Sequence, residues 1–299
     1  MFRELFQQSG LSLDRLHTFC LVAQAGGVTR AAGGDPNTQS LFSRQIKELE
    51  EYFGVELVRR SGRGVVLTKA GEHLFIIARE HLAALADFKA ECNQAPLKLT
   101  IAAGDSLVQW LLLPKLDRLK RRLPNVSFVF LNLKSAEITK RLIEGSIDFG
   151  LVRDSGFSAP LKAIALGTLR HALFVAQSPD GSGDLKQILS KFPVATLEGD
   201  GVFRSELTAA FKRRGLRLEI QVECSSFPLV ARALKTHTAV AVLPTLANSE
   251  LEAGLFAMIS ARMLKRFDRK IVLAWNSRVS RIRSVVEKAK TVIAEEMRF

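Results

Sequence analysis

Hydrophobic positions between residues 38 and 70 first follow the period of a helix and then that of a strand. Four apolar residues recur at spacings of four, three and four, which predicts a helix with one buried stripe: Phe42, Ile46, Leu49 and Phe53. After Gly54, apolar pairs flank the segment RRSGRG at residues 59–64, which predicts a short β-hairpin with a glycine-containing turn. The pattern therefore predicts a helix followed by a basic hairpin.

Polar side chains occupy the other face of this predicted helix. Thr38 is placed to cap its N-terminus, Gln39 lies in the first turn, and four further residues follow at helical spacing: Ser40, Ser43, Arg44 and Lys47. Hydroxyl, amide and long cationic side chains reach base edges and phosphates from the major groove. Arg63, between two glycines, can extend from the hairpin into a narrow minor groove. The alternative is a solvated amphipathic helix with a plain surface turn.

Further helices are predicted on both sides of this segment. Helical periodicity over residues 13–25 ends at two glycines, and Thr29 begins another helix. A long helix follows its cap Thr68 and continues to about Phe88. Its apolar residues are spaced as in the seam of a two-helix coiled coil: Phe75, Ala78, Leu82 and Leu85. The seam predicts pairing with a second copy of the chain, and packing on its own domain is the alternative.

The pattern beyond Pro96 changes to strands that alternate with helices. We predict strands at 97–102, 126–131 and 149–152 and helices at 107–123 and 138–143. Such alternation implies parallel sheets, in which ligands bind beyond the carboxyl ends of the strands. Small or charged residues follow these ends and those of a second unit: Ser106, Ser135, Arg153, Gly199 and Ser226. They suit a carboxylate or phosphate, although plain helix caps are the alternative.

The composition describes a globular chain of two or three domains, with 299 residues, 47% hydrophobic and 24% charged. The net charge of +13 favours an anionic partner. Residues 1–95 are nevertheless neutral overall, so the whole excess lies in residues 96–299. DNA binding therefore has to rest on the placement of individual side chains. Basic runs such as 120–122, 212–214 and 265–270 could contact bent DNA, attract an anionic ligand or solvate the surface, and we favour solvation.

Several other classes of protein are disfavoured by the sequence. Three dispersed cysteines argue against a disulfide framework, a zinc site and a redox sensor with paired thiols. The chain has no run of about 18 apolar residues and no signal peptide, so we expect a cytoplasmic protein that does not enter a membrane. Its five histidines are scattered and no nucleophile or phosphate-loop motif is present, so we expect no enzyme, metal or cofactor.

Taken together, these motifs resemble the LysR-type transcriptional regulators of bacteria over residues 11 to about 295. The N-terminal match includes the segments 16–19, 29–32, 43–46, 54–57, 62–64 and 67–71, and the C-terminal match includes 113–114, 142–148 and 241–244. The resemblance implies an α+β chain with a winged helix-turn-helix at 11–68 and a dimerising linker helix at 69–95. It also implies two lobes like those of periplasmic binding proteins, at 96–166 with 266–299 and at 167–265.

The resemblance also implies partners and roles for residues. Double-stranded DNA would be held in the major groove and at phosphates by ten residues: Thr29, Arg30, Thr38, Gln39, Ser40, Ser43, Arg44, Lys47, Arg60 and Arg63. A small inducer, anionic by the chemistry above, would lie between the lobes against Ser106, Ser135, Arg153, Gly199, Ser226 and His237. Self-association to a dimer and a tetramer is implied, and RNA polymerase is a further partner to consider.

Two segments depart from the family pattern. Asp35 and Asn37 stand where the family buries aliphatic residues, and Ser40 stands where it often has proline. Uncompensated loss of two buried aliphatics would cost about 2 to 5 kcal/mol. An alternative function is therefore an oligomeric ligand-binding or adaptor protein with a degraded DNA-binding turn. Farther on, residues 236–239 replace a glycine-rich turn, so His237 is either an effector contact or a surface residue.

Overall fold

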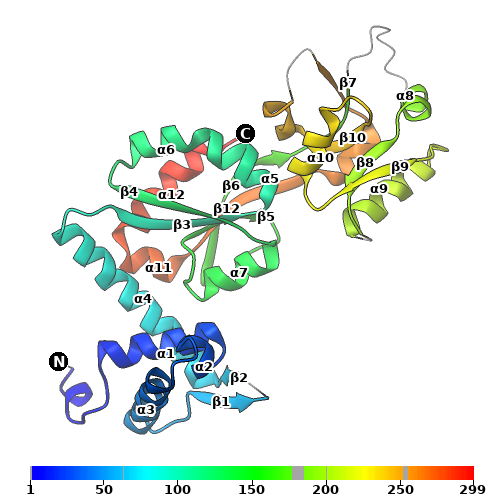
Figure 1. Ribbon diagram of the computed structural model, residues 1–299. Helices are drawn as coiled ribbons and strands as arrows, with labels where there is room; N and C mark the ends of the chain where they lie inside the picture. Colours follow the sequence, from blue (N-terminus) through cyan, green and yellow to red (C-terminus); the bar gives the residue numbers. More distant parts are fainter. Residues whose placement is uncertain (1, 63, 177–184, 200, 252–254) are drawn as a thin grey trace.

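The computed structural model describes residues 2–62, 64–176, 185–199, 201–251 and 255–299. An N-terminal helical domain with a two-stranded wing lies at one end of the molecule (Figure 1). The long helix α4 leads from this domain to an α/β lobe, and a second α/β lobe lies beyond the first. The α+β class expected from the sequence is confirmed.

The N-terminal domain encloses a small core between its helices and the wing. Its elements are η1 (Arg3–Phe6), α1 (Leu13–Ala25), α2 (Val28–Ala31), α3 (Pro36–Phe53), β1 (Val58–Ser61), β2 (Gly64–Leu67) and the first half of α4 (Lys69–Cys92). The predicted stripe of α3 is buried at Ile46 and Leu49, whereas Phe53 is exposed. Thr68 caps α4 as predicted, because its side chain accepts a hydrogen bond from the backbone N–H of Gly71 at 3.0 Å.

The start of α3 differs from the sequence prediction. Asp35 is the N-cap, and its carboxylate accepts a hydrogen bond from the backbone N–H of Thr38 at 2.8 Å. Pro36 occupies the first helical position, where a missing N–H is harmless. Thr38 therefore lies inside the helix, and the prediction that it caps α3 was wrong. Asp35 and Asn37 are exposed, so this turn is closed by capping rather than by the burial of aliphatic side chains.

The predicted seam of α4 does not face outward. Phe75 and Ala78 are buried in the core of the N-terminal domain, and Leu82 packs against the same core. Only Leu85 of the four seam residues is exposed. The prediction that these residues pair with a second copy was wrong for three of them, because α1 already covers that side of the helix.

The first lobe is a five-stranded sheet covered by helices, with strand order β4-β3-β5-β12-β6. Its elements are β3 (Leu97–Ala103), α5 (Asp105–Leu107), η2 (Val108–Leu112), η3 (Leu113–Lys115), α6 (Leu116–Arg122), β4 (Val126–Asn132), α7 (Ser135–Ile143), β5 (Phe149–Arg153), β6 (Leu161–Leu169), β12 (Arg269–Asn276), α11 (Ser277–Ile282) and α12 (Ser284–Glu296). The single helix predicted at 107–123 is replaced by an α, π, 3-10 and α succession. Strands β4, β3 and β5 are parallel, as predicted.

The second lobe contains two small sheets, β10-β7-β11 and β8-β9. Its elements are β7 (His171–Ala176), α8 (Leu185–Lys191), β8 (Val194–Leu197), α9 (Val202–Lys212), β9 (Ile220–Cys224), α10 (Phe227–Leu234), β10 (Ala241–Pro244), η4 (Thr245–Ser249), β11 (Phe256–Ile259) and η5 (Arg262–Phe267). The chain enters this lobe between β6 and β7 and leaves it between η5 and β12. Both crossings lie a few residues later than the expected boundaries after 166 and 265.

The second half of α4 is tied to the first lobe by buried charges. The guanidinium of Arg283 donates to both carboxylate oxygens of Asp87 on α4, at 2.6 and 3.0 Å. It also donates to Asp148, which precedes β5, and to the carbonyl oxygen of Lys98. Since Arg283 and Asp148 are both buried, this network fixes the angle at which α4 leaves the lobe.

Candidate nucleic-acid interface and effector site

The exposed face of α3 carries the residue types predicted to read DNA. Ser43, Arg44 and Lys47 are exposed on the side opposite Ile46 and Leu49, which are buried. Arg44 and Lys47 make only long ion pairs within the helix, to Glu48 at 3.8 Å and to Glu51 at 3.6 Å. Such exposed pairs are weak, so both cations are available to a phosphate or a base. Ser40 is also exposed, whereas Thr38 and Gln39 are half-buried.

Two predicted phosphate contacts on α2 take part in structural hydrogen bonds. The hydroxyl of Thr29 donates to the side-chain oxygen of Gln39 at 3.2 Å, which joins α2 to the first turn of α3. The guanidinium of Arg30 donates to the carbonyl oxygen of Gly26 at 2.5 Å, and the N–H of Val65 donates to the same oxygen at 2.9 Å. Arg30 therefore supports the wing, although its side chain is exposed.

The wing is the antiparallel hairpin of β1 and β2 that the sequence predicted. Arg60 is exposed on β1 and pairs with Val65 in the ladder. Arg63, the predicted minor-groove residue, lies outside the described residues. The wing and α3 lie together at the end of the molecule that is farthest from the lobes (Figure 1).

The predicted effector residues lie at edges of the two lobes that face each other. Ser106 and Ser135 follow the parallel strands β3 and β4, and Arg153 ends β5, so all three lie at one edge of the first sheet. The chain crosses to the second lobe from this same edge, through Leu169 and back through Arg269. In the second lobe, Gly199 and Ser226 follow the parallel strands β8 and β9. Contacts between α5 and α10 hold the two edges together.

His237 does not belong to this group. It lies in the turn after α10, in a left-handed conformation with φ 58°, and its ring stacks on Phe256 with 5.2 Å between centroids. Ser226 begins α10 at the facing edge, so His237 lies at the opposite end of the helix. The length of α10 therefore separates His237 from the facing edge, and its role as an effector contact stays a prediction.

Three residues that were not among the predicted effector contacts complete the facing edges. His171 begins β7, and Arg269 begins β12 two positions before Ile271, which pairs with Arg153. Alternation along the strand places Arg269 and Arg153 on the same face of the sheet. Glu206 of α9 reaches across from the second lobe to Arg269, with 3.6 Å between charged atoms. Arg153 is exposed, yet partial desolvation and then the charge of Arg269 lower its pKa.

Comparison with known proteins agrees with this arrangement. The model of the LysR substrate binding domain matches residues 93–294, and that of the lysR-family bacterial regulatory helix-turn-helix proteins matches residues 13–72. The chain belongs to the LysR family of bacterial transcriptional regulators. It is 28% identical over 252 residues to the HTH-type transcriptional regulator YfeR of Shigella flexneri, which covers 79% of each chain.

Solved structures share the fold of this LysR-family chain. A full-length OxyR variant from Pseudomonas aeruginosa superposes with a TM-score of 0.65 at 20% identity, covering 97% of this chain and 95% of that one. Full-length LysG from Corynebacterium glutamicum, with its bound effector arginine, gives a TM-score of 0.63 at 20% identity, covering 97% and 100%. At this identity the likeness concerns the fold alone.

Trp110 makes a contact between the lobes of this LysR-type regulator that the sequence did not predict. Trp110 of the first lobe is buried among apolar side chains of the second, including Phe174 and Val230. Its indole N–H donates to the carboxylate of Glu250 at 2.8 Å. Since Glu250 follows η4 in the second lobe, the packing and the hydrogen bond of Trp110 join the two lobes.

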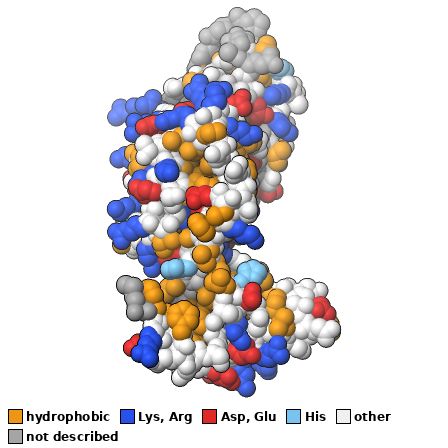
Figure 2. Space-filling model, turned by 90° about the vertical axis from the view of Figure 1, so that its left-hand side faces the viewer, with side chains coloured by type: hydrophobic (Ala, Val, Ile, Leu, Met, Phe, Trp, Pro, Cys, Tyr) orange, Lys and Arg blue, Asp and Glu red, His pale blue; other side chains and the backbone are white. Residues whose placement is uncertain are grey.

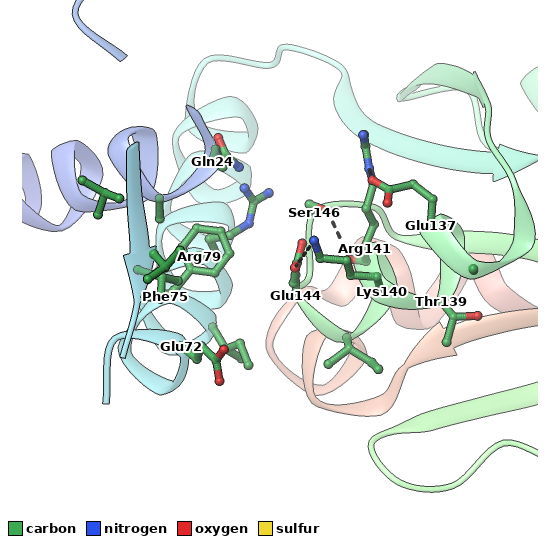
Figure 3. A pocket seen from close by; sticks show the side chains of 17 residues that line it. Gln24, Glu72, Phe75, Arg79, Glu137, Thr139, Lys140, Arg141, Glu144 and Ser146 are labelled. Carbon is green, nitrogen blue, oxygen red and sulfur yellow. Dashed lines mark hydrogen bonds and ion pairs between the residues drawn. The ribbon is translucent and has the colours of Figure 1, made fainter. Parts of the chain in front are cut away.

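A groove of about 1010 Å³ separates the DNA-binding domain from the first lobe (Figure 3). Phe75 and Arg79 of α4 line one side, and Lys140 and Glu144 at the end of α7 line the other. Burial lowers the pKa of Arg79, which donates one long hydrogen bond, of 3.5 Å, to the carbonyl oxygen of Gly145. None of the predicted effector residues lines this groove.

The basic runs differ in how they are neutralised. Arg122 pairs with Glu295 at 2.7 Å and with Glu296 at 3.2 Å. The runs near 212–214 and 262–266 instead meet around one groove of about 340 Å³, which is lined by Arg213, Arg214, Arg262 and Arg266. Basic side chains are accordingly spread over the lobes in Figure 2. Much of the excess charge is thus lobe surface, away from α3.

The described residues also bear on the expectations about membrane spans, metal sites and cysteines. Within the described residues, no helix is long and apolar enough to cross a membrane, and no three metal-ligating side chains are grouped. Cys20 is buried, and desolvation raises its pKa to about 11. Cys224 is half-buried and Cys92 is exposed. No two of these thiols are placed for a disulfide in the part of the chain described.

His171 should make the stability of the second lobe dependent on pH. Desolvation, with the charges of Arg269 and Arg153, lowers its pKa to about 4 from an ordinary value of 6.5. The unfolded chain therefore binds a proton below pH 6.5 that the folded chain binds only near pH 4. We expect the free energy of unfolding to fall by about 3 kcal/mol as the pH decreases across this interval, and to rise again as the pH is restored.

Urea unfolding at pH 7 and at pH 4.5, followed by tryptophan fluorescence, measures this dependence. His171→Phe keeps an aromatic ring among Phe203, Phe227 and Phe267 but cannot titrate. The pH dependence of that variant should be shallower than that of the wild type by about 2 to 3 kcal/mol. Equal pH dependence in both proteins would show that His171 does not titrate differently in the two states.

Proposed function

We propose that this LysR-family regulator binds double-stranded DNA through α3 and the wing, in response to a small anionic effector between its lobes. The observation that supports DNA reading best is the exposed face of α3 with Ser43, Arg44 and Lys47. These side chains project from a helix that Ile46 and Leu49 anchor in the core. Phosphate contacts supply most of the affinity in such an interface, and base contacts supply the specificity.

We propose that two copies pair through a face of α4 other than the predicted seam. Ile77, Leu85 and Phe88 are exposed on α4, at spacings that place them along one side of the helix. Figure 2 shows apolar side chains at the surface where the DNA-binding domain meets the first lobe. A pair of this kind would present two copies of α3 to a two-fold operator. A tetramer, a cytoplasmic location and contact with RNA polymerase stay predictions.

The facing edges of the lobes are the proposed effector site. Arg153 and Arg269 give the first lobe two cations, and Glu206 of the second lobe offsets one of them. Ser106, Ser135 and Gly199 are proposed to line the same edges. An anion that contacts both lobes would bias their relative position, and α4 is fastened to the first lobe by Arg283. We assign the protein this regulatory role and no catalytic one.

The alternative is an adaptor or ligand-binding oligomer that no longer reads DNA. It was motivated by the unusual turn before α3. In the structure this turn is closed by the Asp35 cap and by the hydrogen bond between Thr29 and Gln39. Because that closure leaves the polar face of α3 exposed, it favours the DNA-binding function over the adaptor.

A gel shift with the DNA upstream of the protein's own gene tests the proposal. Arg44→Ala should weaken binding by about 1 to 3 kcal/mol, the usual value of a base contact. Lys89→Ala is the matched control, since it removes one exposed cation at the far end of α4 and should leave affinity unchanged. If Arg44→Ala bound as tightly as the wild type, α3 would not be the reading helix.

A further inference from the structure

The side chain of His171 has a buried ring nitrogen without a hydrogen-bond partner among the described residues. Only 9% of the residue is exposed, and the atom concerned is Nδ1. The backbone N–H is satisfied, since it donates to the carboxylate of Asp268 at 3.2 Å. A buried polar atom without a partner is costly, and native proteins keep few of them. The ring nitrogen of His171 is therefore available to a hydrogen-bonding group that the chain itself does not provide.

The charges around His171 fit an anion with a single negative charge. Desolvation, followed by the charges of Arg269 and Arg153, lowers the pKa of its imidazole to about 4, so the ring is neutral at pH 7. Glu206 pairs with Arg269 and also acts on Arg153. The carboxylate of Asp268 also lies beside His171, so two carboxylates face the two guanidiniums. Among the described residues Arg153 makes no ion pair, and one carboxylate on the bound molecule would pair with it.

Aromatic rings surround the same histidine on the side of the second lobe. Phe203 in the first turn of α9 and Phe227 at the start of α10 are both half-buried, and their centroids are 5.0 Å apart. The centroid of the His171 ring lies 5.8 Å from that of Phe203 and 6.1 Å from that of Phe227. Rings at such spacing favour a further flat ring in an offset or edge-to-face arrangement.

In the part of the chain that the structure describes, neither helix that carries these phenylalanines has a side-chain cap. Gly201 precedes α9, and the hydroxyl of Ser226 makes no capping hydrogen bond to α10. In the DNA-binding domain, by contrast, Ser12, Asp35 and Thr68 each cap a helix. The backbone N–H groups at these helix starts point their positive dipole ends toward the facing edge and add to the positive potential there. They supplement the two arginines and do not define the site alone.

We infer that the effector is an aromatic monocarboxylate that carries a hydroxyl group beside its carboxylate. Its carboxylate would lie on Arg153 and Arg269, its ring against Phe203 and Phe227, and its hydroxyl against Nδ1 of His171. This inference rests on the proposed function, in which the facing edges bind the effector. It goes further by assigning the hydroxyl specificity to His171.

Isothermal titration calorimetry on the full-length protein tests this ligand class with three probes. 2-Hydroxybenzoate should bind at least about tenfold more tightly than benzoate, because only the former reaches the ring nitrogen. Benzoate should in turn bind more tightly than cyclohexanecarboxylate, which lacks a flat ring. Failure of both aromatic carboxylates to bind would overturn the inference.

Variants separate the role of each group. His171→Phe should bind 2-hydroxybenzoate and benzoate equally, and His171→Asn, which keeps a polar atom, should retain part of the preference. Arg153→Gln should weaken both ligands by about tenfold or more. Lys270→Gln removes a neighbouring exposed cation on the other face of β12 and should change neither affinity. Retention of the full preference in His171→Phe would overturn the assignment of that residue.

A gel shift on the same samples distinguishes this inference from the proposed function. If the protein binds its DNA, and an aliphatic carboxylate binds in an Arg153-dependent manner while the aromatic probes do not, the ligand class is wrong and the effector site stands. If no carboxylate binds and Arg153→Gln has no effect on any probe, the effector site itself is wrong, and with it the inference.

Discussion

Arg283→Met should lower the free energy of unfolding of the first lobe by about 3 to 5 kcal/mol, the usual effect of removing one partner from a buried ion pair. Arg283 is 8% exposed and is hydrogen-bonded to Asp87, Asp148 and the carbonyl oxygen of Lys98. Methionine fills a similar volume, so the loss would come mainly from two carboxylates left without a cation. Urea unfolding followed by tryptophan fluorescence and by far-UV circular dichroism measures the change, since Trp275 lies in the core of this lobe and Trp110 in that of the second.

The same substitution should loosen α4 from the lobe. Hydrogen exchange of the backbone amides at residues 80–92 should become faster in Arg283→Met, while those at 69–78, which pack in the DNA-binding domain, should change little. Arg281→Met is the matched control, because Arg281 is exposed two positions earlier. Similar stability losses in both variants would mean that the ion pairs do not hold the linker helix.

Trp110→Ala should be comparably severe, at about 3 to 5 kcal/mol, because it removes a large side chain from a packed core. Trp110 is 5% exposed and belongs to the first lobe, yet it packs in the core of the second. Its loss would also leave the carboxylate of Glu250 without the indole N–H at 2.8 Å. We expect the lobes to separate more easily and the second lobe to unfold first.

Thermal unfolding followed in parallel by far-UV circular dichroism, which reports both lobes, and by the fluorescence of Trp275, which lies in the core of the first lobe, measures this effect. The circular-dichroism transition of Trp110→Ala should begin at a lower temperature than the fluorescence transition of Trp275. Trp110→Phe keeps most of the buried ring and loses only the hydrogen bond, so its loss should be about 1 to 2 kcal/mol. Equal losses for phenylalanine and alanine at this position would show that packing between the lobes contributes little.

Local patterns in the sequence were sufficient to predict which face of α3 is exposed. The helical spacing of Ile46 and Leu49 determines which side of α3 is buried, so the exposure of Ser43, Arg44 and Lys47 followed directly. The start of the helix was less predictable, because Asp35 and Thr38 are both good caps and only three residues apart. Pro36 at the first helical position decides between them, and it was a signal that sequence reading could have used.

The effector edges depended on contacts that no local pattern contains. The carboxyl ends of the predicted strands indicated Ser106, Ser135 and Arg153, because strand ends and helix starts follow from local sequence patterns. His171 and Arg269 are 98 positions apart and meet only because the chain crosses between the lobes twice. The prediction that the apolar seam of α4 pairs with a second copy was wrong for a related reason. The same apolar side chains can pack on α1 or on a second copy, and the spacing along α4 does not distinguish the two.

Hydroxyl-radical footprinting of the full-length protein on its own upstream DNA tests the central claim most directly. Two copies of α3, presented by a dimer, should protect two patches whose centres lie about 10 base pairs, or a multiple of that, apart. Protection should weaken as salt is raised, because phosphate contacts release counterions. Two symmetric patches that weaken in Arg44→Ala are the predicted result. A duplex with no protected position at low salt would contradict the assignment of α3 and the wing as a DNA-reading surface.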